Sequence, residues 1–371
     1  MDDNDIHNDG VRTRVLIVIN TLRMGGAERF AVTMANWLAG QGVDTTMVVF
    51  EDDTSALKPA ASVKTIWLHR RGSWDIPRVV LGLRRAVRAT HPHAIFTTMT
   101  PATLMTALAL TGMRGRPRQV ARECTFHSLA TTRWNRPLQR LVFRVAFRTC
   151  HTVVCLTSAM RADLRDHFGV REELMTVIPN PVDVTRCERL AQAPLAHEFL
   201  TPRAMPLIVS CARLSPPKDF PTVFHALVRL AKEGMPCRLI VLGDGELRAQ
   251  LVELRNRLGL EEFVAFAGTV DNPYAYMARA DVFVLSTYYE GFPNVVIEAM
   301  ACGAPVVCTD CQNGLQEIIT HGTDGLLVPP GDPAALASAL RVLLGDPRLR
   351  AAIARNGRES VTRRFHIDTI G

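Results

Sequence analysis

Short apolar runs recur along the chain, and helical patterns of apolar residues separate them. The first run, RVLIVIN, starts at Arg14. A glycine turn, the helical pattern AERFAVTMANWLAG and the run TTMVVF follow it. This order predicts a strand, a turn, a helix and a second strand. The runs VKTIWL, AIFTT, RQVARE, TVVCLT and MTVIP continue the pattern. The alternation predicts parallel strands with helices on both faces, that is, an α/β domain.

The alternation stops between Thr185 and Pro206, where TRCERLAQAPLAHEFLTPRAMP carries three prolines and no strand pattern. It resumes with LIVSCARL, CRLIVLGDG, FVAFAG, DVFVLST, PVVCTD and GLLVPP. We therefore predict two doubly wound α/β domains. The predicted divisions are a disordered tail at 1–13, a first domain at 14–185, a linker at 186–205 and a second domain at 206–371.

The composition fits two globular domains and excludes several other classes. The chain has 371 residues, of which 47% are apolar and 21% charged, enough for two full cores. Its nine cysteines form no regular framework, and Cys308 and Cys311 of CTDC lack the second pair or the histidines that a zinc site needs. We predict no metal, and reduced thiols in a cytosolic protein. The acidic start MDDNDIHNDGVRTR is no secretory signal, and no stretch has the length of a membrane span.

The net charge of +7 is unevenly distributed. Between Thr54 and Thr149 there are 17 lysines and arginines but only two acidic residues, Asp75 and Glu123. Part of this excess forms a stripe on a predicted helix that starts near Pro137. The residues of this arginine stripe, four apart, are Arg140, Arg144 and Arg148.

Two interpretations of the arginine stripe are open: a solvated face, or a surface that binds anionic lipid. Phe143 and Phe147 fall beside the stripe, which leaves both interpretations open for this helix alone. Six further arginines of the basic block favour an anionic partner: Arg70, Arg71, Arg78, Arg84, Arg85 and Arg88. The opposite, core-facing side is then expected to carry Leu138, Leu141, Val142 and Val145. Nucleic acid is a weaker candidate, because the block has no nucleic-acid-binding motif. We expect a cytoplasmic protein that associates peripherally with the membrane.

Glycines and polar residues come directly after predicted strands, at the end of the sheet where α/β domains bind ligands. MGGAER, with Gly25 and Gly26, opens a helix and is either an anion-binding turn or a plain tight turn. ARLSPPKDF offers Arg213 and Lys218 on a proline-stiffened loop, which suits a diphosphate or is simply exposed. LGDGEL, with Gly243, has the same ambiguity as MGGAER.

Two glutamates, Glu290 and Glu298, lie eight positions apart in EGFPNVVIEAMACGAPVV. EGFPN follows a predicted strand, and NVVIEAMA predicts a helix with Asn294 near its amino cap. Structural salt bridges would explain two such acids. However, both would lie beside the free amides of a helix start. Carboxylates accept hydrogen bonds from the hydroxyls of a ribose or a hexose, while the amides hold phosphate or sugar oxygens. The residues therefore indicate a nucleotide-sugar pocket.

Five segments together resemble the retaining GT-B glycosyltransferases of glycosyltransferase family 4: GGAER, ARLSPPKD, VLGDGEL, FAGTVDN and YYEGFPNVVIEAMACGAPVV. The match runs from about Arg14 to the end, and the E-x7-E spacing is its most specific part. The resemblance implies two Rossmann-like domains that face each other across a cleft. It implies retaining transfer of a hexose or N-acetylhexosamine from a nucleoside diphosphate sugar, with UDP as the expected nucleotide. No cofactor or metal is required. The expected acceptor is a lipid-linked or glycan hydroxyl in surface polysaccharide assembly.

The resemblance also assigns roles. Arg213 and Lys218 would hold the departing diphosphate, Glu290 would contact the donor sugar, and Glu298 would bind the ribose. The first three are the expected catalytic set. The other donor-binding residues, mostly through backbone atoms, are expected to be Gly25, Gly26, Gly243, Val270, Gly291, Phe292, Asn294 and Val295.

The chain departs from this family pattern in two ways. Many relatives carry a histidine near the reacting sugar, whereas this chain has ARECTFH with His127, which we expect in a loop and do not count as catalytic. Relatives also end in a longer helix that crosses back to the first domain. Two alternatives stay open. A UDP-sugar epimerase of the same fold would form product from the donor alone, and a non-catalytic nucleotide-sugar-binding subunit would not need the intact charged set.

Overall fold

The structure, a computed structural model, describes residues 12–23, 25–52, 57–72, 74–130, 135–200, 205–311 and 314–371. Most of the predicted tail at 1–13 lies outside these ranges. The chain divides into two compact units. The first unit comprises the chain up to Ile178 together with Gly371, and the second unit spans Pro179–Ile370. This division comes earlier than the predicted linker at 186–205.

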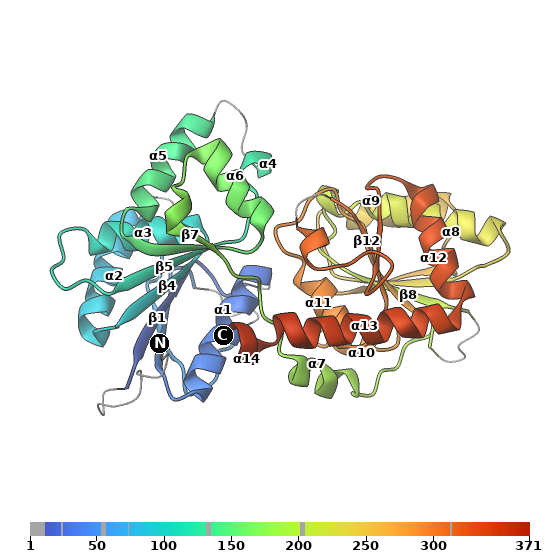
Figure 1. The fold of residues 1–371 in the computed structure, drawn as a ribbon, viewed down its shortest axis with the longest axis horizontal. Coiled ribbons are helices and arrows are strands. Elements are labelled where there is room, and N and C mark those ends of the chain that lie inside the picture. The colour runs from blue at the N-terminus through green and yellow to red at the C-terminus, as the bar shows by residue number, and fades with distance from the viewer. Residues whose placement is uncertain are drawn as a thin grey trace. The chain divides into compact units, whose positions relative to one another are not determined.

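The first unit is a seven-stranded parallel sheet with helices on both faces (Figure 1). Its strands are β1 (Arg14–Ile19), β2 (Asp44–Val49), β3 (Lys64–Trp67), β4 (Ala94–Thr98), β5 (Arg118–Glu123), β6 (Cys150–Cys155) and β7 (Met175–Val177). Its helices are α1 (Gly26–Gly40), α2 (Ile76–Thr90), α3 (Thr100–Leu110), α4 (His127–Ala130), α5 (Arg136–Phe147), α6 (Ser158–Phe168) and the 3-10 turn η2 (Glu172–Leu174). The strand order is β3-β2-β1-β4-β5-β6-β7.

The apolar run of β1 is buried on both faces of this sheet. Successive side chains of a strand point to opposite faces. Leu16 and Val18 therefore pack with α2 and α3 in one core cluster, whereas Ile17 and Ile19 pack with α1 in another. This is why the strand reads as a continuous apolar run and not as an alternating one.

The second unit is a six-stranded parallel sheet in the order β10-β9-β8-β11-β12-β13. Its strands are β8 (Leu207–Cys211), β9 (Arg238–Leu242), β10 (Val264–Gly268), β11 (Val282–Leu285), β12 (Val306–Thr309) and β13 (Leu326–Val328). Its helices are α7 (Val184–Ala191), α8 (Phe220–Lys232), α9 (Arg248–Arg257), α10 (Pro273–Met277), α11 (Asn294–Ala301), α12 (Pro333–Gly345), α13 (Pro347–Phe365) and α14 (Ile367–Ile370), with the 3-10 turns η3 (Pro216–Lys218) and η4 (Leu315–Glu317). The two sheets confirm the predicted pair of doubly wound domains.

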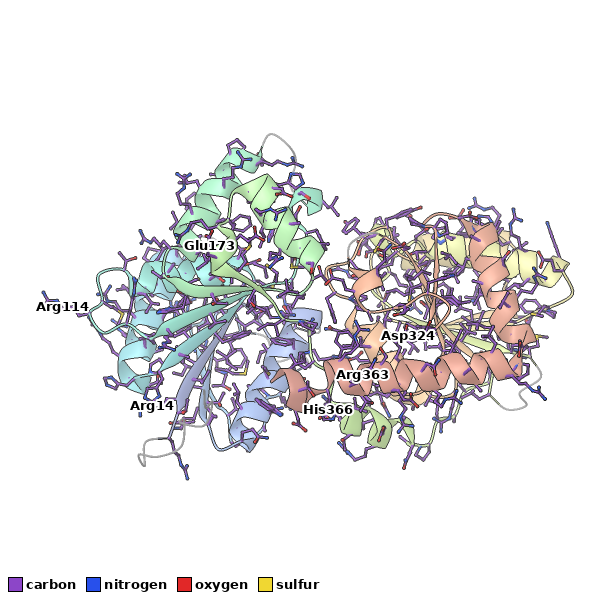
Figure 2. All side chains as sticks on the ribbon, in the orientation of Figure 1. Arg14, Arg114, Glu173, Asp324, Arg363 and His366 are labelled. Atoms are coloured by element: carbon purple, nitrogen blue, oxygen red, sulfur yellow. The ribbon has the colours of Figure 1, made fainter. Side chains whose placement is uncertain are left out.

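The segment predicted as a linker contains a helix that belongs to the second unit. α7 occupies residues 184–191, and the Asp183 side chain caps it by accepting from the Arg186 amide at 2.8 Å. The segment before α7 is also fixed to this unit. Val182 bridges His366, which lies at the junction of α13 and α14 (Figure 2). The chain from Val182 to the end of α7 is therefore structured, although prolines lie nearby.

Candidate functional site

The second sheet has a topological switch point between β8 and β11. From β8 the chain winds to β9 and β10, whereas from β11 it winds to β12 and β13 on the other side. The loops after β8 and β11 therefore leave in opposite directions, and this is where open α/β sheets bind ligands. The loop after β8 carries Arg213 and Lys218, and the loop after β11 carries Glu290. The fold thus brings both predicted loops to adjacent strands.

Lys218 and Glu290 form an ion pair between these two loops. The Lys218 Nζ contacts the Glu290 Oε1, and the two side chains are only 20% and 15% exposed. Lys218 ends η3, whose two prolines restrict the backbone. One mostly buried positive charge and one mostly buried negative charge therefore meet at the switch point.

Arg213 does not join this pair in the structure. Its side chain is 74% exposed, and its Nη2 lies 3.4 Å from the Glu246 Oε2. Arg213 and Lys218 lie on the same loop, but only Lys218 contacts Glu290. The structure therefore does not bring the two predicted diphosphate-binding cations together. Lys218 contacts Glu290, whereas Arg213 pairs with the exposed carboxylate of Glu246 on the neighbouring loop.

Glu298 is buried one turn inside α11, where its Oε1 accepts from the Tyr274 hydroxyl at 3.2 Å. At the start of this helix the Asn294 amide donates to the Phe292 carbonyl at 3.0 Å, and the Asn294 Oδ1 accepts from the Asn180 Nδ2 at 2.8 Å. The sequence reasoning missed Tyr274 and Asn180. Both are distant in sequence, and only the fold brings them to the motif.

The other predicted residues of this helix start lie close by. Phe292 is buried and stacks edge-on with Phe365 at 6.0 Å between ring centroids. Gly291 and Val295 are half-buried on either side of the Phe292–Asn294 turn. Val270 lies half-buried in the loop after β10, at the carboxyl edge of the same sheet.

The glycines of LGDGEL allow two loops to touch. A Cβ at Gly243 would lie 2.1 Å from the Ala212 carbonyl oxygen, and a Cβ at Gly245 would lie 2.4 Å from that of Leu214. Gly243 also has φ +125° and donates its N–H to the Gly268 carbonyl at 2.7 Å. Gly243 therefore serves the close approach of the loop that carries Arg213. This favours the turn interpretation of this motif.

In the first unit, Gly25 caps the amino end of α1, and Gly26 is its first residue. The place where an anion was expected holds the carboxylate of Glu28, whose Oε2 lies 2.3 Å from where a Gly25 Cβ would be. Burial raises the pKa of Glu28. Its hydrogen bond to the backbone and the positive charge of Arg122 lower the pKa, but by less. Arg122 is buried at the end of β5, which lowers its pKa, and its guanidinium lies 3.9 Å from the centroid of the Phe30 ring.

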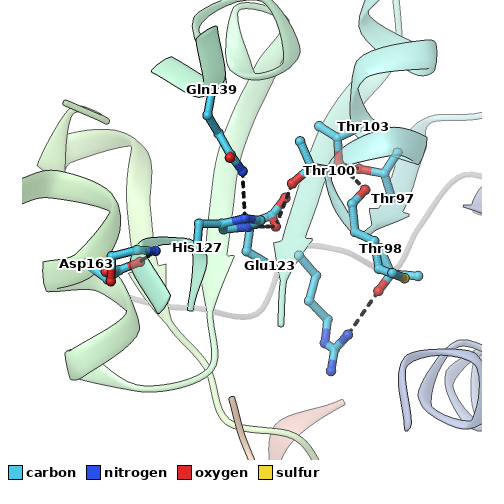
Figure 3. A network of polar contacts seen from close by, with 11 residues as sticks. Thr97, Thr98, Thr100, Thr103, Glu123, His127, Gln139 and Asp163 are labelled. Atoms are coloured by element: carbon cyan, nitrogen blue, oxygen red, sulfur yellow. Dashed lines mark hydrogen bonds and ion pairs between the residues drawn. The ribbon is translucent and has the colours of Figure 1, made fainter. Parts of the chain in front are cut away.

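His127 starts α4 and is buried, so our expectation that it lies in a loop is wrong. Its Nε2 lies 3.0 Å from the Glu123 Oε2, and its Nδ1 lies 2.9 Å from the Gln139 Nε2 (Figure 3). The same Glu123 oxygen accepts from the Thr100 hydroxyl at 3.0 Å. The ring also packs edge-on against Phe143 at 4.8 Å. Both ring nitrogens are thus engaged within the first unit, and the histidine fixes α5 to the end of β5.

The predicted faces of α5 are also wrong. Phe143 and Phe147 are buried, whereas Leu138 and Leu141 are 64% and 54% exposed. The arginine stripe has phenylalanines on one flank and leucines on the other, and the larger aromatic side chains take the core position. Within the stripe, the Arg140 Nε donates to the His167 carbonyl at 2.9 Å, and Arg148 contacts the Thr111 hydroxyl.

Across the described residues, no helix is long and apolar enough to cross a membrane. Cys308 and Cys311 are buried thiols that form no disulfide, and burial raises the pKa of Cys308. In the same part of the chain, no three histidine, cysteine or acidic side chains group closely enough to hold a metal ion.

Two family models match the chain, one mostly over the first unit and one within the second. Glycosyltransferase Family 4 matches residues 24–186, and Glycosyl transferases group 1 matches residues 205–346. The chain is 26% identical over 344 residues to the N-acetylgalactosamine-N,N'-diacetylbacillosaminyl-diphospho-undecaprenol 4-alpha-N-acetylgalactosaminyltransferase of Campylobacter jejuni, with 91% of each chain covered. It is 29% identical to the lipopolysaccharide core biosynthesis glycosyltransferase LpsD of Rhizobium meliloti, over 92% of this chain and 91% of that one.

Solved structures share the fold. HepE from Anabaena, in complex with UDP and glucose, aligns with a TM-score of 0.77 at 23% identity over 97% of each chain. Sucrose-phosphate synthase from Thermosynechococcus elongatus aligns with a TM-score of 0.82 at 21% identity, over 97% of this chain and 96% of that one. The two sheets, the matched models and the relatives together define the chain as a glycosyltransferase with the GT-B fold.

Proposed function

We propose that this chain is a retaining, metal-independent glycosyltransferase of family 4. It moves a hexose or an N-acetylhexosamine from a UDP-sugar to a hydroxyl of a lipid-linked or glycan acceptor in surface polysaccharide assembly. The observation that carries the proposal is the mostly buried Lys218–Glu290 pair at the switch point of the second sheet. The names of the relatives from Campylobacter jejuni and Rhizobium meliloti support the acceptor class.

The donor binds along the carboxyl edge of the second sheet. Glu298, buried beside the Tyr274 hydroxyl, accepts from the ribose hydroxyls. Val270 offers backbone atoms to the base, and the amides from Gly291 to Val295, except that of Pro293, hold the sugar and diphosphate. Glu290 contacts the donor sugar. A solved structure of the same fold, HepE, contains bound UDP, which supports UDP as the nucleotide of the donor.

The chemistry follows from the charges. Lys218, joined by Arg213 after it leaves Glu246, neutralises the charge that develops on the diphosphate as the anomeric bond breaks. The acceptor oxygen bonds to the anomeric carbon on the face that the diphosphate leaves, and its proton passes to a diphosphate oxygen. Configuration is retained without a protein nucleophile.

The first unit binds the acceptor substrate and the membrane surface. The arginine stripe of α5 faces solvent together with the exposed Leu138 and Leu141. Cations beside apolar side chains suit a surface of anionic lipid, because the charges meet head groups while the leucines enter the interface. We propose peripheral association with the cytoplasmic face of the membrane on this basis.

The test is a donor panel followed by product analysis. UDP-, GDP- and ADP-sugars are screened by thermal shift, because ligand binding raises the melting temperature by mass action. The proposal predicts the largest shift with a UDP-sugar, then release of UDP that is slow when water replaces the acceptor hydroxyl and faster with the acceptor, and a product whose anomeric configuration matches the donor. Conversion of the donor sugar to its epimer without acceptor would identify the epimerase alternative. Binding without either reaction would identify a non-catalytic subunit.

A further inference from the structure

Thr287 forms hydrogen bonds with the residues that precede the two charged residues of the proposed site. It is fully buried, two residues after β11. Its Oγ1 lies 3.0 Å from the Pro217 carbonyl oxygen and 3.0 Å from the Tyr289 carbonyl oxygen. Pro217 directly precedes Lys218, and Tyr289 directly precedes Glu290. The single hydrogen of this hydroxyl is therefore shared between two carbonyls, and these belong to the peptide groups that lead into both charged residues.

Neighbouring groups hold Thr287 itself in place. Its N–H donates to the Thr309 Oγ1 at 2.7 Å, and the Thr309 hydroxyl donates to the Thr287 carbonyl at 2.7 Å. Thr309 is the buried last residue of β12. The backbone N–H and carbonyl of Thr287 are thus both anchored to the side chain at the end of β12.

The turn that carries Lys218 is held at three consecutive carbonyls. The Pro217 carbonyl accepts from Thr287 and also from the Tyr288 amide at 2.8 Å. The next two carbonyls, of Lys218 and Asp219, lie 2.9 and 3.0 Å from the Ser286 Oγ. Asp219 has φ +39°, a left-handed conformation that is disfavoured for a non-glycine residue and needs support from its surroundings.

We propose that Thr287 is a positioning residue, which fixes Lys218 and Glu290 relative to each other so that the ammonium group stays where charge develops on the diphosphate. The inference rests on the proposed function. A lysine side chain has four rotatable bonds, so its charge stays in one place only when its backbone and the partner of its ammonium group, here Glu290, are both held. A fixed charge stabilises a transition state without reorganising during the reaction, and this is the advantage of a preorganised site.

A purely structural role is the alternative, since a buried hydroxyl also satisfies carbonyls elsewhere. The two roles differ in how they couple to Lys218. If Thr287 acts through Lys218, its hydroxyl matters only while Lys218 is present. If it only stabilises the loops, its removal has the same effect with or without Lys218, because independent effects add.

The experiment is a double-mutant cycle of Thr287→Val and Lys218→Ala. Turnover is measured as UDP released by hydrolysis of the UDP-hexose that gives the largest thermal shift, so no acceptor is needed. Thr287→Val keeps the shape and removes the hydroxyl. Thr106→Val is the matched control, because Thr106 is buried and its hydroxyl donates to the Ala102 carbonyl at 2.8 Å in the first unit.

Thr287→Val is expected to lower turnover about 10-fold while the Kd for UDP changes less than about 3-fold, the pattern of a contact that matters most in the transition state. Thr287→Ser, which keeps the hydroxyl, should restore most of the turnover. Thr106→Val should leave turnover unchanged. In the Lys218→Ala background, Thr287→Val should lower turnover by less than about 2-fold.

Three results would overturn the proposal: equal losses in both backgrounds, a Thr287→Ser enzyme as slow as Thr287→Val, or unchanged turnover in Thr287→Val. Full turnover in Lys218→Ala alone would instead refute the proposed role of Lys218, and with it any need to position that residue. If Thr287→Val fails to fold, Ser286→Ala is placed in the same cycle, because Ser286 holds the Lys218 carbonyl directly.

Discussion

Replacing Lys218 by alanine should affect turnover and stability through different groups, which allows the two effects to be separated. The substitution removes the ammonium group that contacts the Glu290 Oε1. In the reaction, the diphosphate loses a charge-assisted contact as it departs. In the unliganded protein, the Glu290 carboxylate loses its cation while it stays mostly buried.

The structure sets the size of each effect. Loss of one preplaced charge at a developing oxyanion should raise the barrier by about 2 to 4 kcal/mol, which is about 30- to 1000-fold in rate. Removing one partner of a fully buried pair costs about 3 to 5 kcal/mol. Because water reaches part of both side chains here, we expect the free energy of unfolding to fall by only about 1 to 3 kcal/mol.

The assay combines UDP release with urea unfolding in Lys218→Ala and in the double variant Lys218→Ala/Glu290→Gln. The second substitution removes the unpaired charge, so the free energy of unfolding should return toward the wild-type value while turnover stays low. Turnover within about 3-fold of wild type in Lys218→Ala would refute the electrostatic role. Turnover that recovers together with stability in the double variant would mean that instability alone caused the loss.

Other expected outcomes address the metal, the glycine loop, the membrane surface and pH. Activity should survive EDTA, because side-chain cations supply the charge at the diphosphate; rescue of a lost activity by magnesium or manganese would reject this. Gly243→Ala should lower the free energy of unfolding by about 1 to 3 kcal/mol more than Gly259→Ala in urea melts, because both positions have positive φ but only Gly243 abuts the Ala212 carbonyl. Replacing the arginine stripe with glutamine should weaken binding to anionic vesicles and reduce its salt dependence without changing UDP affinity; undiminished binding would remove this helix from the membrane surface. Since burial raises the pKa of Glu28 above its unfolded value, its ionised form opposes folding. Glu28→Gln should therefore raise the melting temperature at pH 7, with a gain that shrinks as pH falls through the raised pKa; a gain independent of pH would contradict this.

The strands were predictable because burial on both faces leaves a continuous apolar run in the sequence. RVLIVIN is such a run, and β1 occupies Arg14–Ile19 within it. The position of the candidate residues was predictable for a related reason, since the carboxyl ends of parallel strands share one edge of a sheet. Lys218 and Glu290 follow β8 and β11, and those strands are neighbours.

The pairing of side chains was not predictable from local pattern. Nothing near Arg213 in the sequence indicates that it pairs with Glu246 while Lys218 pairs with Glu290, because both contacts join separate loops. The faces of α5 illustrate a second limit. Apolar residues flank the arginine stripe on both sides, so periodicity alone does not show which side is buried. Phe143 is on the buried side because its ring packs against His127 and Phe168.

The helix inside the predicted linker had a signal that the prolines obscured. Asp183 stands before VTRCERLA, in the position of a helix cap, and its side chain does cap α7. Val184 and Cys187 are buried, which gives this short helix a packed side. Among the described residues, Pro181 precedes α7 and Pro194 follows it, so prolines flank this helix without excluding it.

Calorimetric titration of UDP into the wild-type protein, Glu298→Gln and Glu290→Gln tests the central claim most directly. If the carboxyl edge of the second sheet is the donor site, wild type binds UDP, and Glu298→Gln binds it more weakly by about 1 to 3 kcal/mol, since the ribose loses charge-assisted hydrogen bonds. Glu290→Gln should bind UDP almost as wild type does, because Glu290 acts on the sugar that UDP lacks. Equal UDP affinities in wild type and Glu298→Gln, or equal losses in both variants together with lowered melting temperatures, would mean that these carboxylates are structural and that the donor site lies elsewhere.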